Sequence, residues 1–180
     1  QEVSKRMMID KEELLSALND DKICRKYGMD TQTIQCIFIP NTYDVYWNIS
    51  VEKFLDRMKK EYEAFWNNER KNKAEAIGMT QQEVVTLASI IDEETANNAE
   101  KPMVAGMYIN RLKINMPLQA DPTIKYAWQQ FGLKRIYNKL LHIDSPYNTY
   151  KNTGLPPGPI RIPSIAGIDA VLNYVKHDNL

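Results

Sequence analysis

The stretch LASIIDEETANNAE, residues 87–100, gathers the groups of this sequence that could do acid–base chemistry. It carries four carboxylates, at Asp92, Glu93, Glu94 and Glu100. A carboxyl group can act as a general acid or base when its surroundings bring its pKa toward the working pH. Acidic runs on helices more often face water, so the chemistry depends on whether one of these side chains turns inward.

Helical geometry separates the three adjacent acids. At about 100° per residue, Glu94 shares the side of Leu87 and Ile91, which lie seven and three positions earlier. Glu93 points almost the opposite way, into solvent, and Asp92 lies on the flank. We therefore expect burial to raise the pKa of Glu94, which suits a general acid near neutral pH.

Two structural alternatives compete with this interpretation. In one, the helix frays at Asp92 and Glu94 merely caps a turn. In the other, Glu94 forms a salt bridge to Arg111 or Lys113 of the following helix, which would lower its pKa.

Two helices must position these residues. Thr80 with Glu83 has the signature of a capping box, and apolar residues in helical period follow it. Pro102 suits the first turn of a second helix, which we expect to end at about Lys113. A third helix is expected after Ser164.

Other stretches predict a mixed architecture. Helical patterns cover residues 10–27, with Asp10 as N-cap, and residues 50–67. The β-branched and aromatic stretch 34–47 predicts two strands joined by a turn. Residues 67–78 are polar and expected to be exposed, and a long proline-rich loop follows residue 143. This alternation predicts an α+β, or mixed α/β, fold.

Composition restricts the partners and cofactors. Lys+Arg and Asp+Glu number 23 each, so net charge gives no reason to expect nucleic acid. Cys24 and Cys36 form no metal-ligand pattern, which predicts no metal and no cofactor. Two buried free thiols are the simpler interpretation of these cysteines, and a disulfide is the alternative. No apolar run is long enough to span a bilayer.

Four long motifs occur in order: LASIIDEET, VAGMYINRLKINMPLQADPTIKY, SPYNTYKNTGLPPGPI and IPSIAGIDAVLNY. With the upstream FIPNTYDVYW, they resemble the catalytic domain of the MltG/YceG-like endolytic murein transglycosylases. The resemblance implies a catalytic domain at residues 36–180, truncated at its C-terminus. It also implies that residues 1–35 are a helical remnant of a LysM-like subdomain.

The same resemblance implies the reaction. The acid of that family is the second Glu of an E-x-E-T pattern, which is Glu94 here, and the first Glu is Asp92, which implies a supporting residue. The single Glu would protonate the β-1,4 bond between MurNAc and GlcNAc. It would then accept the proton of the C6 hydroxyl, leaving a 1,6-anhydro end without water.

The resemblance also implies a cellular context. The substrate would be peptidoglycan glycan strands, and peptidoglycan synthases would be partners. An N-terminal anchor preceding Gln1 would hold the protein in the bacterial cytoplasmic membrane, with its catalytic domain outside the cytoplasm. The alternative function is a non-catalytic module that binds peptidoglycan or a partner protein.

LQADPT supplies two of the expected substrate-binding residues. Gln119 and Asp121 alternate with apolar neighbours, so both can face one side of an extended segment. Asp121 could instead cap a helix that begins at Pro122.

PYNTY and the end of the second helix supply the others. Tyr147 and Tyr150 could stack on sugar rings, and Asn148 could bond to sugar groups or stabilise a turn. Asn110 is a further candidate. Arg111 could pair with an acid of the DEET stretch, bind a stem-peptide carboxylate, or cap its helix.

Overall fold

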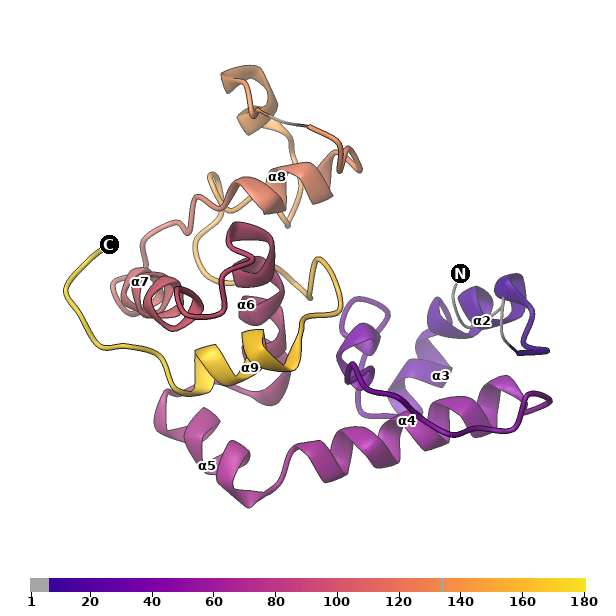
Figure 1. Ribbon diagram of the computed structural model, residues 1–180. Coiled ribbons are helices and arrows are strands. Elements are labelled where there is room, and N and C mark those ends of the chain that lie inside the picture. Colours follow the sequence, from indigo (N-terminus) through magenta and orange to yellow (C-terminus); the bar gives the residue numbers. More distant parts are fainter. Residues whose placement is uncertain (1–6, 134) are drawn as a thin grey trace.

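The computed structural model describes residues 7–133 and 135–180. Over these ranges the chain forms α-helices and two short 3-10 helices, and no β-strand (Figure 1). The prediction of an α+β fold is therefore wrong for the described residues, which form a helical structure. In chain order the elements are α2 (Lys11–Leu18), α3 (Asp21–Lys26), η1 (Ile34–Ile37), α4 (Val51–Phe65), α5 (Asn68–Ala76), α6 (Gln81–Glu94), α7 (Lys101–Lys113), α8 (Asp121–Ala127), η2 (Asn138–His142) and α9 (Ile165–Leu172).

Helix α6 lies at the centre of the fold (Figure 1). Helices α5, α7, α8 and α9 and the 3-10 helix η1 all contact it. The predicted capping box is confirmed, since the Glu83 N–H donates to Thr80 Oγ1 at 3.2 Å and the Thr80 N–H donates to the Glu83 carboxylate at 2.8 Å. Residues 84–91 are buried, so only the two ends of α6 reach the surface.

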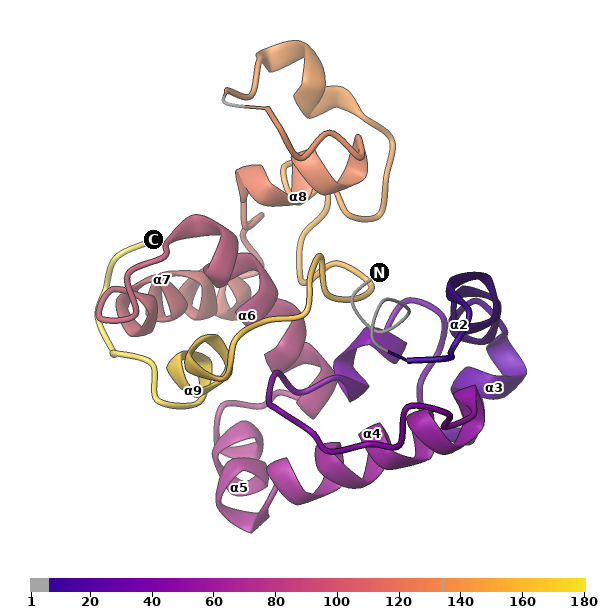
Figure 2. The ribbon, with the colours of Figure 1, turned by 45° about the vertical axis from the view of Figure 1, so that its right-hand side comes forward.

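Helices α4 and α5 run along the base of the molecule and connect α2 and α3 with the group around α6 (Figure 2). The helix predicted over residues 10–27 is divided in two. Asp10 caps the first part as predicted. Asp20 caps the second part by accepting from the Lys22 N–H at 2.8 Å, and this local cap starts α3.

Residues 34–47 give the main correction to the predicted fold. They form η1 and then an extended segment that joins no sheet within the described residues. Ile34, Ile37 and Ile39 are buried in the core all the same. β-branched side chains favour strands only where a neighbouring backbone is available to pair with, and here helix surfaces take up these side chains instead.

The remaining predicted helices agree with the structure more closely. Ser50, Pro102 and Ser164 lie at the starts of α4, α7 and α9 as expected. Residues 67–78, predicted only as polar and exposed, contain α5, because the Asn67 side chain accepts from the Arg70 N–H at 3.0 Å. Helix α5 is polar on most of its surface and buries only Ala74.

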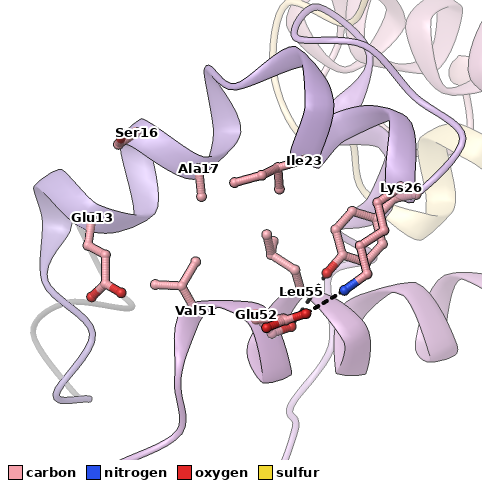
Figure 3. A pocket seen from close by; sticks show the side chains of 9 residues that line it. Glu13, Ser16, Ala17, Ile23, Lys26, Val51, Glu52 and Leu55 are labelled. Atoms are coloured by element: carbon pink, nitrogen blue, oxygen red, sulfur yellow. Dashed lines mark hydrogen bonds and ion pairs between the residues drawn. The ribbon is translucent and has the colours of Figure 1, made fainter.

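A cavity of about 500 Å³ lies between α2, α3 and α4 (Figure 3). The Lys26–Glu52 ion pair lies at one end of it. Apolar side chains reach into it from both sides: Ala17, Ile23, Val51 and Leu55. No residue of the stretch 87–100 lines this cavity, which places it apart from the acids singled out above.

Candidate active site

Glu94 is the last residue of α6, at the point where this helix leaves the core. The helix does not fray at Asp92, because Thr95 ends it with an extended backbone of φ −144° and ψ 133°. Side chains fix the turn that follows. Thr95 Oγ1 and Asn97 Nδ2 both donate to the Glu100 carboxylate, at 3.0 Å and 2.9 Å. This turn returns the chain as α7, which packs against α6.

Tyr108 of α7 holds the Glu94 carboxylate. Its hydroxyl donates to Glu94 Oε1 at 2.8 Å. Burial raises the pKa of Glu94 above its ordinary value, and the hydrogen bond from Tyr108 opposes that rise. Glu94 as a residue is nevertheless exposed, so its carboxyl is partly desolvated and still reachable. A carboxyl whose pKa is raised and which a bound molecule can reach is suited to transfer a proton to that molecule.

Charges on α7 and α8 also act on Glu94. Asp121 raises its pKa, whereas Lys125 and Arg111 lower it. Arg111 is turned partly inward, where one of its guanidinium nitrogens donates to the Leu118 carbonyl and its Nε is buried without a partner among the described residues. The ion pairs of the described chain include none between Glu94 and Arg111 or Lys113, so the salt-bridge alternative finds no support.

Asp121 and Tyr150 form a second hydrogen-bonded pair beside Glu94. The Tyr150 hydroxyl donates to Asp121 Oδ1 at 2.6 Å. Asp121 is the first residue of α8 and its side chain does not cap the helix, so its carboxylate is turned to Tyr150 instead. Burial and the neighbouring Asp121 carboxylate raise the pKa of Tyr150, which keeps the phenol protonated as a donor.

Thr149 joins the two motifs that carry these residues. The Gln119 N–H donates to the Thr149 carbonyl at 3.0 Å, and the Ala120 N–H donates to Thr149 Oγ1 at 3.0 Å. Thr149 Oγ1 also lies 2.8 Å from Thr123 Oγ1, and both threonines are buried. Gln119 itself is exposed and adopts a left-handed backbone with φ 53°, which few non-glycine residues do.

Asn148 is fully buried in the loop before Tyr150. Its Nδ2 donates to the carbonyls of Leu141 and Ile143, each at 2.9 Å. Its Oδ1 accepts from the Tyr150 N–H at 3.0 Å. The buried amide thus fixes the loop that carries Tyr150, in the manner of the Asn-stabilised turn considered from the sequence.

Asp92 lies two residues before Glu94 and connects three helices. Its Oδ1 lies 2.7 Å from Lys101 Nζ, and the two side chains are only 4% and 6% exposed. Asp92 also accepts hydrogen bonds from the N–H and the hydroxyl of Ser164. Ser164 in turn caps α9 by accepting from the Gly167 N–H at 3.0 Å. Asp92 of α6 therefore fixes the starts of α7 and α9.

The sequence profile of the YceG-like family matches residues 1–180. This chain belongs to the YceG-like family.

Named relatives agree with this assignment. The endolytic murein transglycosylase of Bacillus subtilis (strain 168) is 40% identical over 135 residues, which are 73% of this chain and 36% of the relative. The protein of the same name from Streptococcus pneumoniae serotype 2 (strain D39 / NCTC 7466) is 34% identical over 149 residues, 78% of this chain and 26% of the relative. This YceG-like chain thus spans little more than a third of the first relative and about a quarter of the second.

A solved structure shares the fold. A 2.6 Å crystal structure of a yceG-like protein from Listeria monocytogenes superposes on the chain with a TM-score of 0.79 and 29% sequence identity. The match covers 98% of this chain and 62% of the other one. The helical arrangement described above is therefore similar to that of another family member.

Two residues predicted for the site of the YceG-like chain make structural contacts. Asn110 Nδ2 donates to the carbonyls of His177 and Asn179, at 2.6 Å and 3.0 Å, and so ties α7 to the C-terminal segment. Tyr147 packs its ring on Tyr126, with centroids 4.7 Å apart, and is partly buried against the core. The predicted contact of Asn110 with substrate finds no support in this geometry.

Tyr108 and Lys125 act on Glu94 but were not predicted as candidate site residues. Tyr108 lies three residues before Arg111 on the same side of α7, so the predicted contact of Arg111 with the acidic stretch could have indicated it. Lys125 lies four residues after Asp121 on α8 and could have been found in the same way. The position of Thr149 depends on tertiary packing, and no local pattern indicates it.

Three further properties concern the described residues only. No three His, Cys, Asp or Glu side chains there gather as a metal site. Cys24 and Cys36 are both buried and free, and burial raises the pKa of Cys36 to about 12, which keeps it a thiol. No helix within residues 7–133 and 135–180 is both long and apolar enough to cross a membrane.

Proposed function

We propose that this chain carries the active site of an endolytic peptidoglycan transglycosylase, with Glu94 as its acid and base. The relatives from B. subtilis and S. pneumoniae bear the name endolytic murein transglycosylase. The observation that carries the proposal is the Glu94 carboxyl, whose pKa is raised by burial and which Tyr108 holds at the open end of α6. The substrate is the glycan strand of peptidoglycan, and the protein acts in the cell envelope.

In the first half of the reaction, protonated Glu94 donates its proton to the glycosidic oxygen between MurNAc and GlcNAc. The bond from that oxygen to C1 of MurNAc breaks, and its electron pair stays on the oxygen. GlcNAc leaves as an alcohol, and C1 becomes an oxocarbenium-like centre. Because Tyr108 donates to Glu94 Oε1, the transferable proton belongs on Oε2.

In the second half, the Glu94 carboxylate accepts the proton of the C6 hydroxyl of the same MurNAc. O6 attacks C1, which closes the 1,6-anhydro ring and restores protonated Glu94 without consuming water. The nearby hydroxyl replaces the second carboxylate that most glycoside hydrolases use. Asp121, held by Tyr150, supplies negative charge that stabilises the cationic sugar.

The resemblance noted in the sequence supports a further proposal about the whole protein. It would have an N-terminal membrane anchor, a LysM-like subdomain that ends near residue 35, and a catalytic domain outside the cytoplasm beside peptidoglycan synthases. Cell fractionation and protease accessibility of the full-length protein would test this arrangement. A full-length protein recovered entirely from the cytosol would contradict it.

Product analysis tests the proposed reaction. The full-length protein is incubated with isolated glycan strands, and mass spectrometry of the products should find 1,6-anhydroMurNAc ends. Glu94→Gln should reduce their formation by about three orders of magnitude or more, as expected when a general acid is removed. Circular dichroism should show that the variant stays folded.

Glu75→Gln is the matched control, because Glu75 is an exposed carboxylate on α5 without a hydrogen bond in the described structure. It should cleave strands at the parent rate. Products with reducing ends would indicate a hydrolase instead. If Glu94→Gln cleaved strands as fast as the parent protein, Glu94 would not be the acid.

A further inference from the structure

A second cavity, of about 360 Å³, lies beside the proposed active site. Helix α6 contributes one wall, α8 and the segment after it another, and the loop before α9 the third. Its lining residues are Glu93, Pro122, Lys125, Tyr126, Phe131, Ile160 and Arg161. Lys125 lines the cavity and also acts electrostatically on the Glu94 carboxyl. Lys125 therefore couples the cavity electrostatically to Glu94.

Two cations and one carboxylate give this cavity a net positive charge. Arg161 and Glu93 form an ion pair of 2.6 Å, with side chains 48% and 42% exposed. A pair this exposed contributes little to stability, so the guanidinium can accept a second anion. Lys125 takes part in no ion pair and no side-chain hydrogen bond within residues 7–133 and 135–180. An anion in the cavity would give Lys125 a partner.

The rest of the lining is apolar or aromatic. The rings of Tyr126 and Phe131 meet edge to face, with centroids 6.3 Å apart and an interplanar angle of 66°. Pro122 and Ile160 complete this wall, and both are buried. A ligand that matches the cavity would carry a carboxylate next to a small apolar group, because the cations and the apolar wall line the same space.

We propose that this cavity binds a carboxylate-bearing substituent of muramic acid, with the carboxylate held by Lys125 Nζ and the Arg161 guanidinium. The proposal rests on the proposed function, since it takes peptidoglycan as the substrate. Muramic acid bears a lactyl ether in which a methyl group adjoins a carboxyl. On bare strands this carboxyl is free, and on substituted strands it is joined to a peptide with its own carboxylates and methyl groups.

Occupation of the cavity would also act on the reaction. Lys125 lowers the pKa of Glu94, and a carboxylate bound to Lys125 offsets that effect. The bound substituent thus favours protonated Glu94 at the moment when the glycosidic oxygen is in place.

Binding measurements separate the two sources of the carboxylate. The full-length Glu94→Gln protein, which does not consume its ligand, is titrated with three strands of equal length. One is bare, one is bare with its lactyl carboxyls converted to methyl amides, and one carries stem peptides. If the lactyl group is recognised, the bare strand should bind about tenfold more tightly than its methyl amide, as expected for one charge-assisted contact. If the peptide is recognised, these two should bind equally and the peptide-bearing strand about tenfold more tightly.

Variants at the two cations decide whether the cavity is responsible. Lys125→Met and Arg161→Met should each remove the preference for the charged strand, and Lys125→Arg should keep it because the charge is retained. The control variant Lys60→Met removes an exposed lysine of α4, and it should retain the preference for the charged strand. If Lys125→Met and Arg161→Met weaken all three strands equally, or keep the full preference, the proposed subsite is wrong. The proposed function is tested apart from this, because the products of the parent protein are analysed separately.

Discussion

The Tyr108 hydroxyl and Glu94 Oε1 are joined by a 2.8 Å hydrogen bond across the contact between α6 and α7. Burial and the neighbouring Glu94 raise the pKa of Tyr108, so the phenol remains a donor over the physiological range. The bond fixes one oxygen of the carboxyl and leaves the other for chemistry. It also opposes the rise in the pKa of Glu94 that burial causes.

Tyr108→Phe should therefore change both the rate and its pH dependence. Removing a donor to the carboxylate disfavours the charged form, so the pKa of Glu94 should rise further. Because the general acid must be protonated, the high-pH limb of the kcat/KM profile should move to higher pH. The maximal rate should fall by about tenfold, because the carboxyl loses its fixed orientation. A profile of unchanged shape would show that Tyr108 does not act on Glu94.

Asp121→Asn and Lys125→Met should move the same limb in opposite directions. Asp121 raises the pKa of Glu94 and Lys125 lowers it, so the first variant should shift the limb to lower pH and the second to higher pH. Neutral strands should be used, so that recognition of a substrate carboxylate does not enter the comparison. High salt should shrink both shifts, because exposed charges are screened. Shifts of the same sign would contradict the charge arrangement.

Glu94→Gln should stabilise the fold increasingly as pH rises. The pKa of Glu94 is higher in the folded protein than its ordinary value, so its contribution to stability is complete below the ordinary carboxyl pKa of about 4.3. That contribution is lost as pH rises through the raised folded value. The difference in Tm between Glu94→Gln and the parent should thus be larger at pH 8 than at pH 4. A difference that is independent of pH would mean that Glu94 is not desolvated.

The buried Asp92–Lys101 pair should show strong coupling in a double-mutant cycle. Removing either partner leaves the other charge buried, which costs about 3 kcal/mol or more of unfolding free energy. Asp92→Asn combined with Lys101→Met should cost less than the sum of the single variants, as measured by urea denaturation. The exposed Asp21–Arg25 pair of α3 serves as a control and should show little coupling. Additive effects at Asp92 and Lys101 would refute the coupling.

Gly167→Ala should destabilise the contact between α6 and α9. A Cβ at Gly167 would lie 2.5 Å from Asp92 Oδ1, whereas a Cβ at Gly132 would have no neighbour within 4 Å. In a helix, Ala is normally better than Gly by about 1 kcal/mol, but here the added methyl group forces Asp92 away from Ser164. Thermal unfolding should show a clear loss for Gly167→Ala and almost none for Gly132→Ala. Equal midpoints would mean that the contact can relax.

Local sequence patterns predicted the helix starts well. A cap at Thr80 or Ser164 depends on atoms within three residues, so its signature is complete in the sequence. The strands predicted at 34–47 failed for the opposite reason. A strand needs a partner backbone from elsewhere in the chain, and propensity alone does not provide one.

In the candidate site, too, local features were predictable and those that depend on distant segments were not. Helical period singled out Glu94 as the candidate among three adjacent acids, because the direction of a side chain on a helix follows from its position. The structure buries Asp92 more deeply, since its side chain is 4% exposed, whereas Glu94 is exposed as a residue. Periodicity did not show that Asn148 is buried inside its loop or that Asn110 faces the C-terminal segment. Those directions depend on where distant segments pack.

The sequence by itself thus determined where the helices that carry these acids begin, and it singled out Glu94 as the candidate acid. Only the tertiary structure decided that Tyr108 holds Glu94 and that Asp92 is buried against Lys101. It also decided that a cationic cavity forms beside Glu93. The physical reason is how far apart in the sequence the interacting residues lie. Caps and helical faces arise from bonds over a few residues, whereas desolvation and paired charges arise when α6, α7, α8 and α9 come together.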